Sequence, residues 1–417
     1  MRILFTNNTL DKPAGTELSV YDYARSLKAR GHEVAAYSRQ QGEVARRLQG
    51  AGVVVVGAPV DAPWKPELIH GQHQWETGLA ALAFPDVPVV SFCRGTAPWQ
   101  EAPCRAPNVE RWVAVDEVCR QHLIGKFEVP GNRVEVVLNG VDLGKFPLRA
   151  PLPEKPRRVL VFSNYAKEDN FLARIREACA TEGVECRAVG SGVGEVVADP
   201  ATVLAESDLV FAKGKAALEA IVSGCGLVVC DADGLGPLVT GENFVGLRSL
   251  SFAYGAMTDE ISVENVRGLL RDWDAGGCQA ASRLAREVAS LEGVVNQLEK
   301  LYEKVAGEWR ESPQPGQDEM AAWAAKFFAD QSTPYKLGRE LQLMWRTLHG
   351  SEVPNNAKAE TVEMHRIMHA FREQEMRVAK LEEKVGNCGK KIASLKEKLD
   401  GAGQKKKPWL FSLRAKK

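Results

Sequence analysis

The sequence predicts an α/β protein built from two doubly wound domains that face a cleft, followed by a helical extension. Three observations predict it. Short β-branched runs alternate with amphipathic stretches over the first three hundred residues, this pattern restarts near residue 157, and a heptad pattern occupies the end of the chain. Strands that are apolar on both faces and alternate with helices are typical of a parallel sheet covered by helices. A chain of 417 residues has room for about two to three domains.

The first predicted domain covers residues 1–145. Its predicted strands are short runs rich in Val, Ile, Leu and aromatic residues, bounded by polar or glycine-containing segments. Apolar residues from Leu18 to Leu27 recur at helical spacing after the first strand, and Gly31 ends this helix. In chain order, the strands are predicted at residues 2–7, 33–38, 52–56, 67–72, 87–93 and 111–116.

The second predicted domain covers residues 146–309 and repeats the same alternation. Residues 138–156 are rich in Pro and Gly, which is typical of a linker between domains. The strands are predicted at residues 157–164, 185–190, 208–213 and 226–231, with a helix at 171–180 between the first two. We therefore expect two similar domains joined by a short hinge.

The last predicted region covers residues 310–417 and is a helical extension. Apolar residues from Met364 to Leu399 alternate steps of three and four, with Gln374 as one polar member, which predicts a coiled coil over 361–400. The strict period favours a partner helix from a second copy of the chain, and hence a homo-oligomer. The alternative is one amphipathic helix packed on the protein's own domains. The tail 405–417 places six basic residues around aromatic and apolar side chains, which favours an anionic membrane surface or a disordered tail equally.

Composition and charge exclude several classes of protein. Lys plus Arg equals Asp plus Glu at 54 each, so the balance points to neither nucleic acid nor a general acidic partner. The nine cysteines form no C-x-x-C pair and no metal-ligand spacing, which is typical of a reducing compartment. No apolar run approaches 18 residues, and the first residues lack the apolar core of a signal peptide. We expect a cytoplasmic protein that is soluble or peripheral on the inner face of the membrane.

The stretch from Lys213 to Val239 carries the strongest chemical signal. A helix that begins at Gly214 directs free backbone N–H groups and the positive end of its dipole at the preceding strand's end, where phosphates bind. Lys213 and Lys215 add positive charge, and Glu219 lies at a depth where a carboxylate accepts hydrogen bonds from ribose hydroxyls. A second glycine turn, around Gly234, follows the next strand. The alternative interpretation is glycines that only cap these elements and a solvated Glu219.

Three ordered motifs resemble the GT-B glycosyltransferases, specifically the large retaining family four that uses nucleotide-sugar donors. They are "AGTELSVYDYARSLKARGHEV" at 14–34, "VEVVLNGVDLGKF" at 134–146 and "GKAALEAIVSGCGLVVCDADGLGPLV" at 214–239. The resemblance covers about residues 1–305 and implies two facing Rossmann-like domains. It places the acceptor mainly on the first domain and the nucleotide-sugar donor mainly on the second.

The resemblance also implies roles for individual residues. Glu219 matches the second acid of the family's Glu-x7-Glu motif, which contacts ribose, and Gly214 matches the glycine that faces the phosphates. Lys167 resembles the family's basic residue on the donor diphosphate, while Asn164 stands nearest to the position of the usual paired arginine. The family's glycine loop before the first helix faces the donor phosphates and the acceptor. In this chain, that loop contains Gly15 and Thr16.

The sequence departs from the family pattern at two positions. The first acid of Glu-x7-Glu falls on Phe211, so that Lys213 or Lys215 becomes the candidate for the donor-binding role. Arg94 stands where many relatives place a histidine close to the transferred sugar. An arginine stays charged at neutral pH and binds phosphate or carboxylate rather than accepting a proton. We predict Arg94, Lys167 and Lys215 as the catalytic residues.

His70, His73 and Glu101 are candidates for the acceptor side, because the two histidines lie at the end of a predicted strand that faces the cleft and Glu101, in "PWQEAP", is a candidate cleft acid. The alternatives are histidines satisfied by backbone groups and a surface carboxylate in a loop. "DAD" at 231–233 and "DWD" at 272–274 formally resemble metal-binding triplets, but such triplets are common by chance, and we predict no metal site. "GSGVGE" at 190–195 lacks the third glycine of a dinucleotide fingerprint, so we predict no cofactor.

The resulting hypothesis is a metal-independent glycosyltransferase that moves a sugar, with retention, from a nucleotide-sugar donor to a glycan or lipid-linked acceptor. Its expected setting is surface polysaccharide or glycan biosynthesis, with no nucleic-acid partner. The alternative is a catalytically inactive GT-B-like scaffold or binding protein that uses the coiled coil. The substitutions at Phe211 and Arg94 favour that alternative.

Overall fold

The computed structural model describes residues 1–96, 98–197 and 199–328. Residues 1–325 form one compact unit. The predicted coiled coil at 361–400 and the basic tail at 405–417 lie outside the described residues, so both stay predictions.

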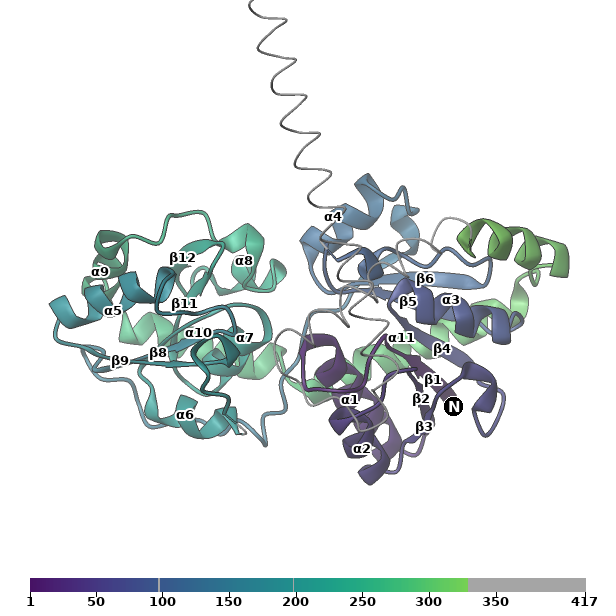
Figure 1. Cartoon of the computed structure of the whole chain (residues 1–417), viewed down its shortest axis with the longest axis horizontal. Coiled ribbons are helices and arrows are strands. Elements are labelled where there is room, and N and C mark those ends of the chain that lie inside the picture. The colour runs from purple at the N-terminus through teal and green to yellow at the C-terminus, as the bar shows by residue number, and fades with distance from the viewer. Residues whose placement is uncertain (97, 198, 329–417) are drawn as a thin grey trace, which may run out of the picture. The chain divides into compact units, whose positions relative to one another are not determined.

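The first sheet has seven parallel strands in the order β3-β2-β1-β4-β5-β6-β7 (Figure 1). Every predicted strand of the first domain is present, because each is a short run rich in apolar residues, and all except β3 at the edge are largely buried in the sheet. Only the short β7 was not predicted. The strands are β1 (Arg2–Thr6), β2 (Glu33–Tyr37), β3 (Val54–Val56), β4 (Leu68–Gln72), β5 (Val89–Cys93), β6 (Val109–Ala114) and β7 (Val134–Val136).

Strands β1 and β4 pair with each other, for example at Leu4 and Ile69, and the strand order reverses between them. Ligands of doubly wound proteins bind outside the carboxyl ends of the strands at such a reversal. The α-helices of the first domain are α1 (Gly15–Ala29), α2 (Glu43–Gly50), α3 (Gln74–Ala83) and α4 (Glu117–Gly125). Short 3-10 helices lie at η1 (Pro59–Asp61), η2 (Trp99–Glu101) and η3 (Gly131–Arg133).

The second sheet has five strands in the order β12-β11-β10-β8-β9, of which β12 alone is antiparallel to its neighbour. The strands are β8 (Arg158–Phe162), β9 (Glu185–Val189), β10 (Leu209–Ala212), β11 (Gly226–Asp231) and β12 (Gly234–Leu238). The helices are α5 (Phe171–Thr181), η4 (Ser191–Val193), α6 (Pro200–Glu206), α7 (Gly214–Val222), α8 (Phe244–Ser249), η5 (Tyr254–Ala256), α9 (Val263–Arg271) and α10 (Ala275–Val288). One face of this sheet packs against α6, α7, α8 and α10, and the other packs against α5 and α9.

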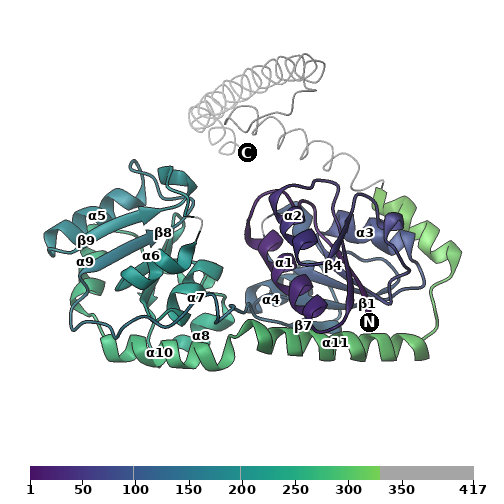
Figure 2. The same ribbon diagram turned by 90° about the horizontal axis from the view of Figure 1, so that it is seen from below.

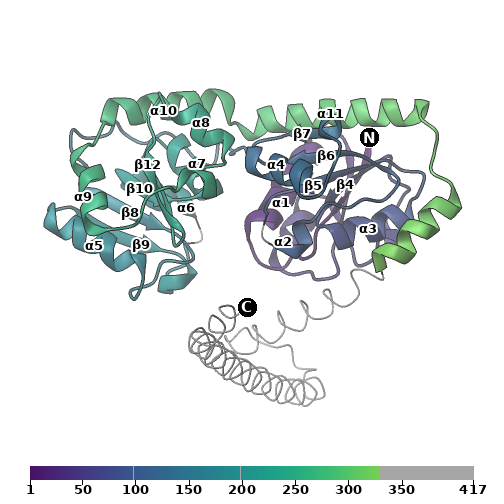
Figure 3. The same ribbon diagram turned by 90° about the horizontal axis from the view of Figure 1, so that it is seen from above.

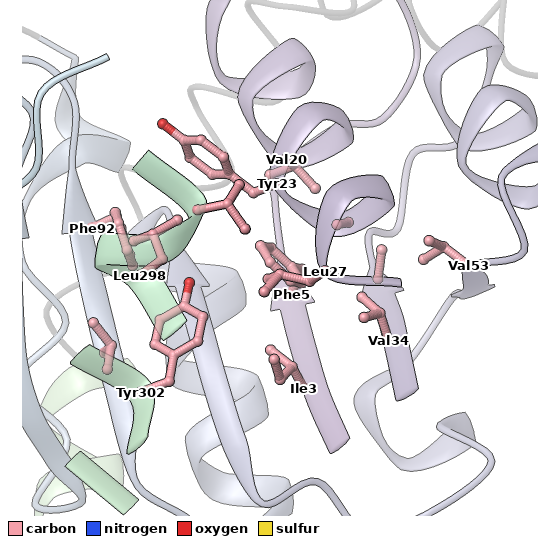
Figure 4. Close-up of a cluster of buried hydrophobic side chains, with 14 of the residues drawn as sticks. Ile3, Phe5, Val20, Tyr23, Leu27, Val34, Val53, Phe92, Leu298 and Tyr302 are labelled. Atoms are coloured by element: carbon pink, nitrogen blue, oxygen red, sulfur yellow. The ribbon is translucent and has the colours of Figure 1, made fainter. Parts of the chain in front are cut away.

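The long helix α11 (Leu291–Glu311) belongs to the core of the first domain. Figures 2 and 3 show α10 beside the second domain's elements and α11 beside the first domain's. Leu298 and Tyr302 of α11 lie in one buried cluster with Phe5, Tyr23 and Phe92 (Figure 4). The predicted boundary at 309 therefore needs correction, because residues 291–311 complete the first core rather than the second.

Candidate functional site

A cavity of about 250 Å³ lies where the starts of α1 and α7 meet the loops after β5 and β6. The sequence-predicted residues that line it are Gly15, Thr16, Arg94, Gly214 and Lys215. The remaining wall includes Ser19, Asn139 and the segment 250–254. The structure thus brings together side chains and backbone from six separate segments of the sequence.

Gly15 and Thr16 form the first turn of α1, so the amino end of that helix faces the cavity. A Cβ atom at Gly15 would meet nothing within 4 Å, which leaves the backbone open to a ligand. Thr16 Oγ1 donates to the carboxylate of Glu17 at 2.9 Å. Burial raises the pKa of Glu17, a residue that the sequence interpretation did not select. The signal that could have selected Glu17 is an acid in the first turn of a helix that begins with a glycine.

Arg94 follows β5 and is held on the cavity wall by groups from two other segments. Its Nη2 donates to Ser19 Oγ at 2.8 Å and to Asn139 Oδ1 at 2.5 Å. The guanidinium also lies 5.7 Å from the ring centroid of Tyr23, within the range of a cation–π interaction. None of these partners is a carboxylate, so the positive charge of Arg94 is oriented without being neutralised.

His73 and Glu101 do not line the cavity; both are buried and support the loop that carries Arg94. His73 Nδ1 accepts a hydrogen bond from the Asn8 backbone at 3.1 Å, so its Nε2 carries the proton toward Glu101 Oε1 at 3.3 Å. The other carboxylate oxygen of Glu101 accepts from the Arg94 backbone N–H at 2.8 Å. The predicted direct contact of these two residues with an acceptor is corrected to a positioning role behind Arg94. His73 has φ of 66°, a conformation that is uncommon outside glycine and is concentrated at functional sites.

His70 is a core residue rather than an acceptor contact. Its ring stacks between Phe5 and Phe92, with centroid distances of 4.3 Å and 3.8 Å. Its Nδ1 is 2.6 Å from the hydroxyl of Tyr302 on α11. Burial holds the pKa of His70 well below its usual value, so the ring is neutral. The prediction of an acceptor-side role is corrected because no face of this ring reaches solvent.

The start of α7 reaches the cavity through Gly214 and Lys215. Gly214 has φ of +62°, and a Cβ there would meet nothing within 4 Å, so glycine is required for backbone conformation rather than for space. Its N–H donates to the carbonyl of Phe252 at 3.0 Å. Lys215 Nζ lies 2.7 Å from Asp22 Oδ2 on α1. This ion pair joins the two helices whose amino ends face the cavity.

Phe211 does not occupy the place of a missing sugar-binding acid. It lies within β10, its side chain is fully buried, and it packs in the core beside α5 and α9. Lys213 alone connects β10 to α7. Counting back from Glu219 by the spacing of the Glu-x7-Glu motif therefore reaches a residue inside β10. The turn between β10 and α7 is too short to present an acid above the sheet.

Lys213 is not among the residues that line the cavity, and carboxylates neutralise its charge. Its Nζ lies 2.7 Å from Asp231 Oδ2 and 3.1 Å from Asp233 Oδ2. It also sits over the rings of Tyr165 and Tyr254, at 5.3 Å and 5.0 Å from their centroids. Burial alone would lower the pKa of Lys213, but the two carboxylates outweigh it and raise that pKa. The residues of the "DAD" triplet are thus partners of a lysine.

Gly234 lies outside the cavity lining as well, in a tight hairpin between β11 and β12. Its φ is +157°, and the carbonyls of Met257 and Asp259 would lie 3.2 Å from an added Cβ. The glycine therefore permits close packing of backbone segments, so the second glycine turn, for which we predicted donor binding at Gly234, is a β-hairpin turn.

Glu219 lines a second cavity of about 420 Å³, together with Asp22, Arg25, Lys145 and Lys215. Lys215 belongs to the walls of both cavities, so Glu219 lies immediately behind the first one. Burial raises the pKa of Glu219 to about 7, although Lys215 and Lys145 oppose this shift. A carboxylate poised near neutral pH fits a hydrogen-bonding role toward hydroxyl groups.

Asn164 and Lys167 are exposed and line neither of these two cavities. The Asn164 side chain accepts from the backbone of Ser191 at 3.0 Å, and the Lys167 backbone donates to Asn170 Oδ1 at 2.9 Å. Both residues therefore shape the turn after β8, and the cavity lining does not include the positive charge predicted at Lys167.

Within the described residues, no cluster of three or more His, Cys, Asp or Glu side chains has the arrangement of a metal site. In the same part of the chain, no helix combines the length and the apolar character needed to cross a bilayer.

The chain is similar in sequence to one protein family and in structure to several solved proteins. Residues 60–145, in the first domain, match the model of the family described as Glycosyltransferase Family 4. No curated protein matches the sequence. Among solved structures, Anabaena HepE in complex with UDP-glucose superposes with a TM-score of 0.54 and 14% identity, over 73% of this chain and 100% of that chain. HepE with UDP and glucose gives a TM-score of 0.52 and 14% identity, over 72% and 99% of the two chains. A glycosyltransferase from Rickettsia africae ESF-5 superposes with a TM-score of 0.52 and 12% identity, over 73% of this chain and 98% of that chain.

At these identities the structural similarity establishes the fold, and the predicted GT-B architecture is confirmed. The family model and this fold together confirm the predicted class, a glycosyltransferase that resembles family four.

Proposed function

We propose that the chain transfers a sugar from a nucleotide-sugar donor, whose diphosphate binds in the 250 Å³ cavity, to a glycan or lipid-linked acceptor. The observation that carries the proposal is the meeting of three sources of positive potential in one cavity. These are the amino end of α1, the amino end of α7 and the guanidinium of Arg94, while the ammonium of Lys215 lines the same cavity in an ion pair with Asp22. Anions bind at such helix ends, and arginine adds a fork of donors that matches phosphate. HepE, which shares the fold, is described with UDP and with UDP-glucose.

The reaction we propose needs charge stabilisation more than a general base. The bond between the anomeric carbon and the phosphate oxygen breaks, and the acceptor oxygen bonds to that carbon from the same face. The proton of the acceptor hydroxyl passes to the leaving phosphate oxygen. Arg94 stays protonated and stabilises the negative charge that develops on the leaving group. Because the acceptor attacks from the face that the leaving group departs from, we propose retention of configuration. Because Arg94 and the helix amino ends stabilise the leaving group, we propose that no metal ion is needed.

We also propose a cytoplasmic setting in surface polysaccharide or glycan assembly. The basic tail at 405–417, with its aromatic residues, supports contact with an anionic membrane where lipid-linked acceptors lie. It lies outside the described residues, so this contact and the coiled-coil homo-oligomer rest on the sequence pattern.

A donor screen tests the proposal directly. Purified protein is incubated with a panel of nucleotide sugars, with and without lipid-linked acceptors, and released nucleoside diphosphate is measured. We expect release with one donor class, the same rate in the presence of EDTA, and a product anomer that NMR identifies as retained. Arg94→Met should lower the rate at least about tenfold, the value of one charge-assisted hydrogen bond. Release with no donor, or a rate unchanged in Arg94→Met, would contradict the proposal.

A further inference from the structure

Arg248 is a buried cation to which the preceding sections assign no role. It lies in the last turn of α8, and 8% of its surface is exposed. Its Nε and Nη1 atoms are buried and have no hydrogen-bond partner. Burial lowers the pKa of this guanidinium, and no neighbouring carboxylate opposes that shift. An uncompensated buried charge is strongly destabilising.

In contrast to Arg248, the buried acidic side chains of the described residues all have partners. Asp208 pairs with Arg149 at 2.7 Å, and Asp231 pairs with Lys213 at 2.7 Å. The carboxylates of Glu17, Glu76, Glu101 and Asp116 each contact a hydroxyl, a cation, a histidine or a backbone N–H. Within residues 1–96, 98–197 and 199–328, Arg248 thus stands apart as a buried charged side chain without an ionic or hydrogen-bonded partner.

The surroundings of Arg248 point to the donor cavity. Arg248 lines a space of about 10 Å³ together with Asn139, Gly214 and Ser251. These three neighbours also line the 250 Å³ cavity. Arg248 itself does not line the 250 Å³ cavity, but it shares these three wall residues with it and therefore lies next to that cavity, near the start of α7.

The segment that follows Arg248 is unusual as well. Ser251 and Phe252 both have positive φ, of 53° and 50°, which costs free energy in residues other than glycine. The Phe252 carbonyl accepts the Gly214 N–H, so this strained segment forms part of the cavity wall at the start of α7.

We propose that Arg248 binds the diphosphate of the nucleotide-sugar donor at the start of α7, a step that rests on the function proposed above. Its planar fork of donors matches phosphate oxygens, which would compensate its charge. Asn164 and Lys167, to which the family resemblance assigns the diphosphate, are exposed and line neither this cavity nor the small space beside it. In this chain, α8 supplies the cation that the turn after β8 does not.

The test compares Arg248→Met with Arg286→Met. Methionine keeps the apolar stem of Arg248 and removes its buried charge. Arg286 is a matched control in the same domain, since its Nη1 donates to the carbonyls of Phe146 at 3.1 Å and Val222 at 2.8 Å. Affinity for inorganic pyrophosphate and for a panel of nucleoside diphosphates is measured by calorimetry, and the unfolding temperature is measured without ligand.

For Arg248→Met we expect affinity for pyrophosphate to fall between about tenfold and a hundredfold, with an unfolding temperature equal to or above that of the parent. For Arg286→Met we expect the reverse, a lower unfolding temperature and unchanged affinity. Arg248→Lys, which keeps a point charge without the fork, should fold and bind with intermediate affinity.

Each other result overturns the inference. Equal affinity in the parent and Arg248→Met would remove Arg248 from the donor site and leave the proposed function standing. A lowered unfolding temperature in Arg248→Met would assign a structural role instead. A parent protein that binds neither pyrophosphate nor any nucleoside diphosphate would overturn the inference and the proposed function together.

Discussion

Single residues of one type acquire different roles from their tertiary surroundings. Lys213 and Lys215 flank the same glycine, and either could serve the donor on sequence grounds. Lys213 is paired with two carboxylates of its own domain, while Lys215 lines the cavity and pairs with Asp22 of α1. The side chains diverge because Lys213 caps the helix from the strand side, whereas Lys215 lies on its first turn. Of these two lysines, only Lys215 lines the cavity in which we propose that the donor binds.

Glu219 provides a prediction at the residue scale. Its pKa is raised to about 7 by burial, so the folded state holds a proton that the unfolded state has already released above about pH 4.5. The folded protein therefore loses stability as pH rises from about 5 to 7, and the loss is complete above pH 7. Glu219→Gln should remove this dependence and make the protein more stable than the parent at pH 8, with little difference at pH 5.

The measurement is the urea midpoint of both proteins at pH 5, 6, 7 and 8. The same pair also tests the ribose assignment, since an ionised carboxylate accepts hydrogen bonds from hydroxyls better than an amide does. Nucleoside diphosphate affinity of the parent should rise from pH 6 to 8, and that of Glu219→Gln should be lower and should rise less, since only the ionisation of the terminal phosphate remains. Parallel pH curves for the two proteins would contradict both statements.

At the scale of elements, the connections carry more information than the helices and strands themselves. The one-residue turn between β10 and α7 removes the position at which the first acid of Glu-x7-Glu would stand. The turn around Gly234 is a hairpin that adds β12 to the sheet. Strand β12 escapes prediction because its sequence, GLGPL, contains the residues that normally end strands.

Helix α11 provides a prediction at this scale. Leu298 is fully buried against the first sheet, so Leu298→Ala should lower the free energy of unfolding of that domain by about 2–5 kcal/mol. Denaturant unfolding followed by fluorescence measures the change. Lys300→Ala, an exposed position on the same helix, is the control and should change the free energy by less than about 0.5 kcal/mol. A similar small effect for Leu298→Ala would mean that α11 does not complete the first core.

At the scale of the whole molecule, the heptad pattern predicts an assembly. Deleting residues 361–417 should lower the oligomeric mass measured by light scattering, because the coiled-coil seam is removed. A point variant, Leu381→Asp, places a charge in the seam and should have the same effect without shortening the chain. An unchanged mass in both proteins would leave the amphipathic helix packed on its own domains as the better interpretation.

The sequence by itself determined the two doubly wound sheets, because buried parallel strands require apolar runs that are visible locally. It also determined the ordered motifs that place Gly15, Thr16, Gly214 and Lys215, and Arg94 at the end of the strand predicted at 87–93, since strand ends and helix starts carry glycine and charge in recognisable order. Only the tertiary structure decided that His70 is a core residue, that His73 and Glu101 support Arg94, and that α11 packs on the first sheet. Those outcomes depend on contacts between residues far apart in the chain. The unpaired charge of Arg248 belongs to the same group, because burial and the lack of a partner within the described residues are properties of its surroundings.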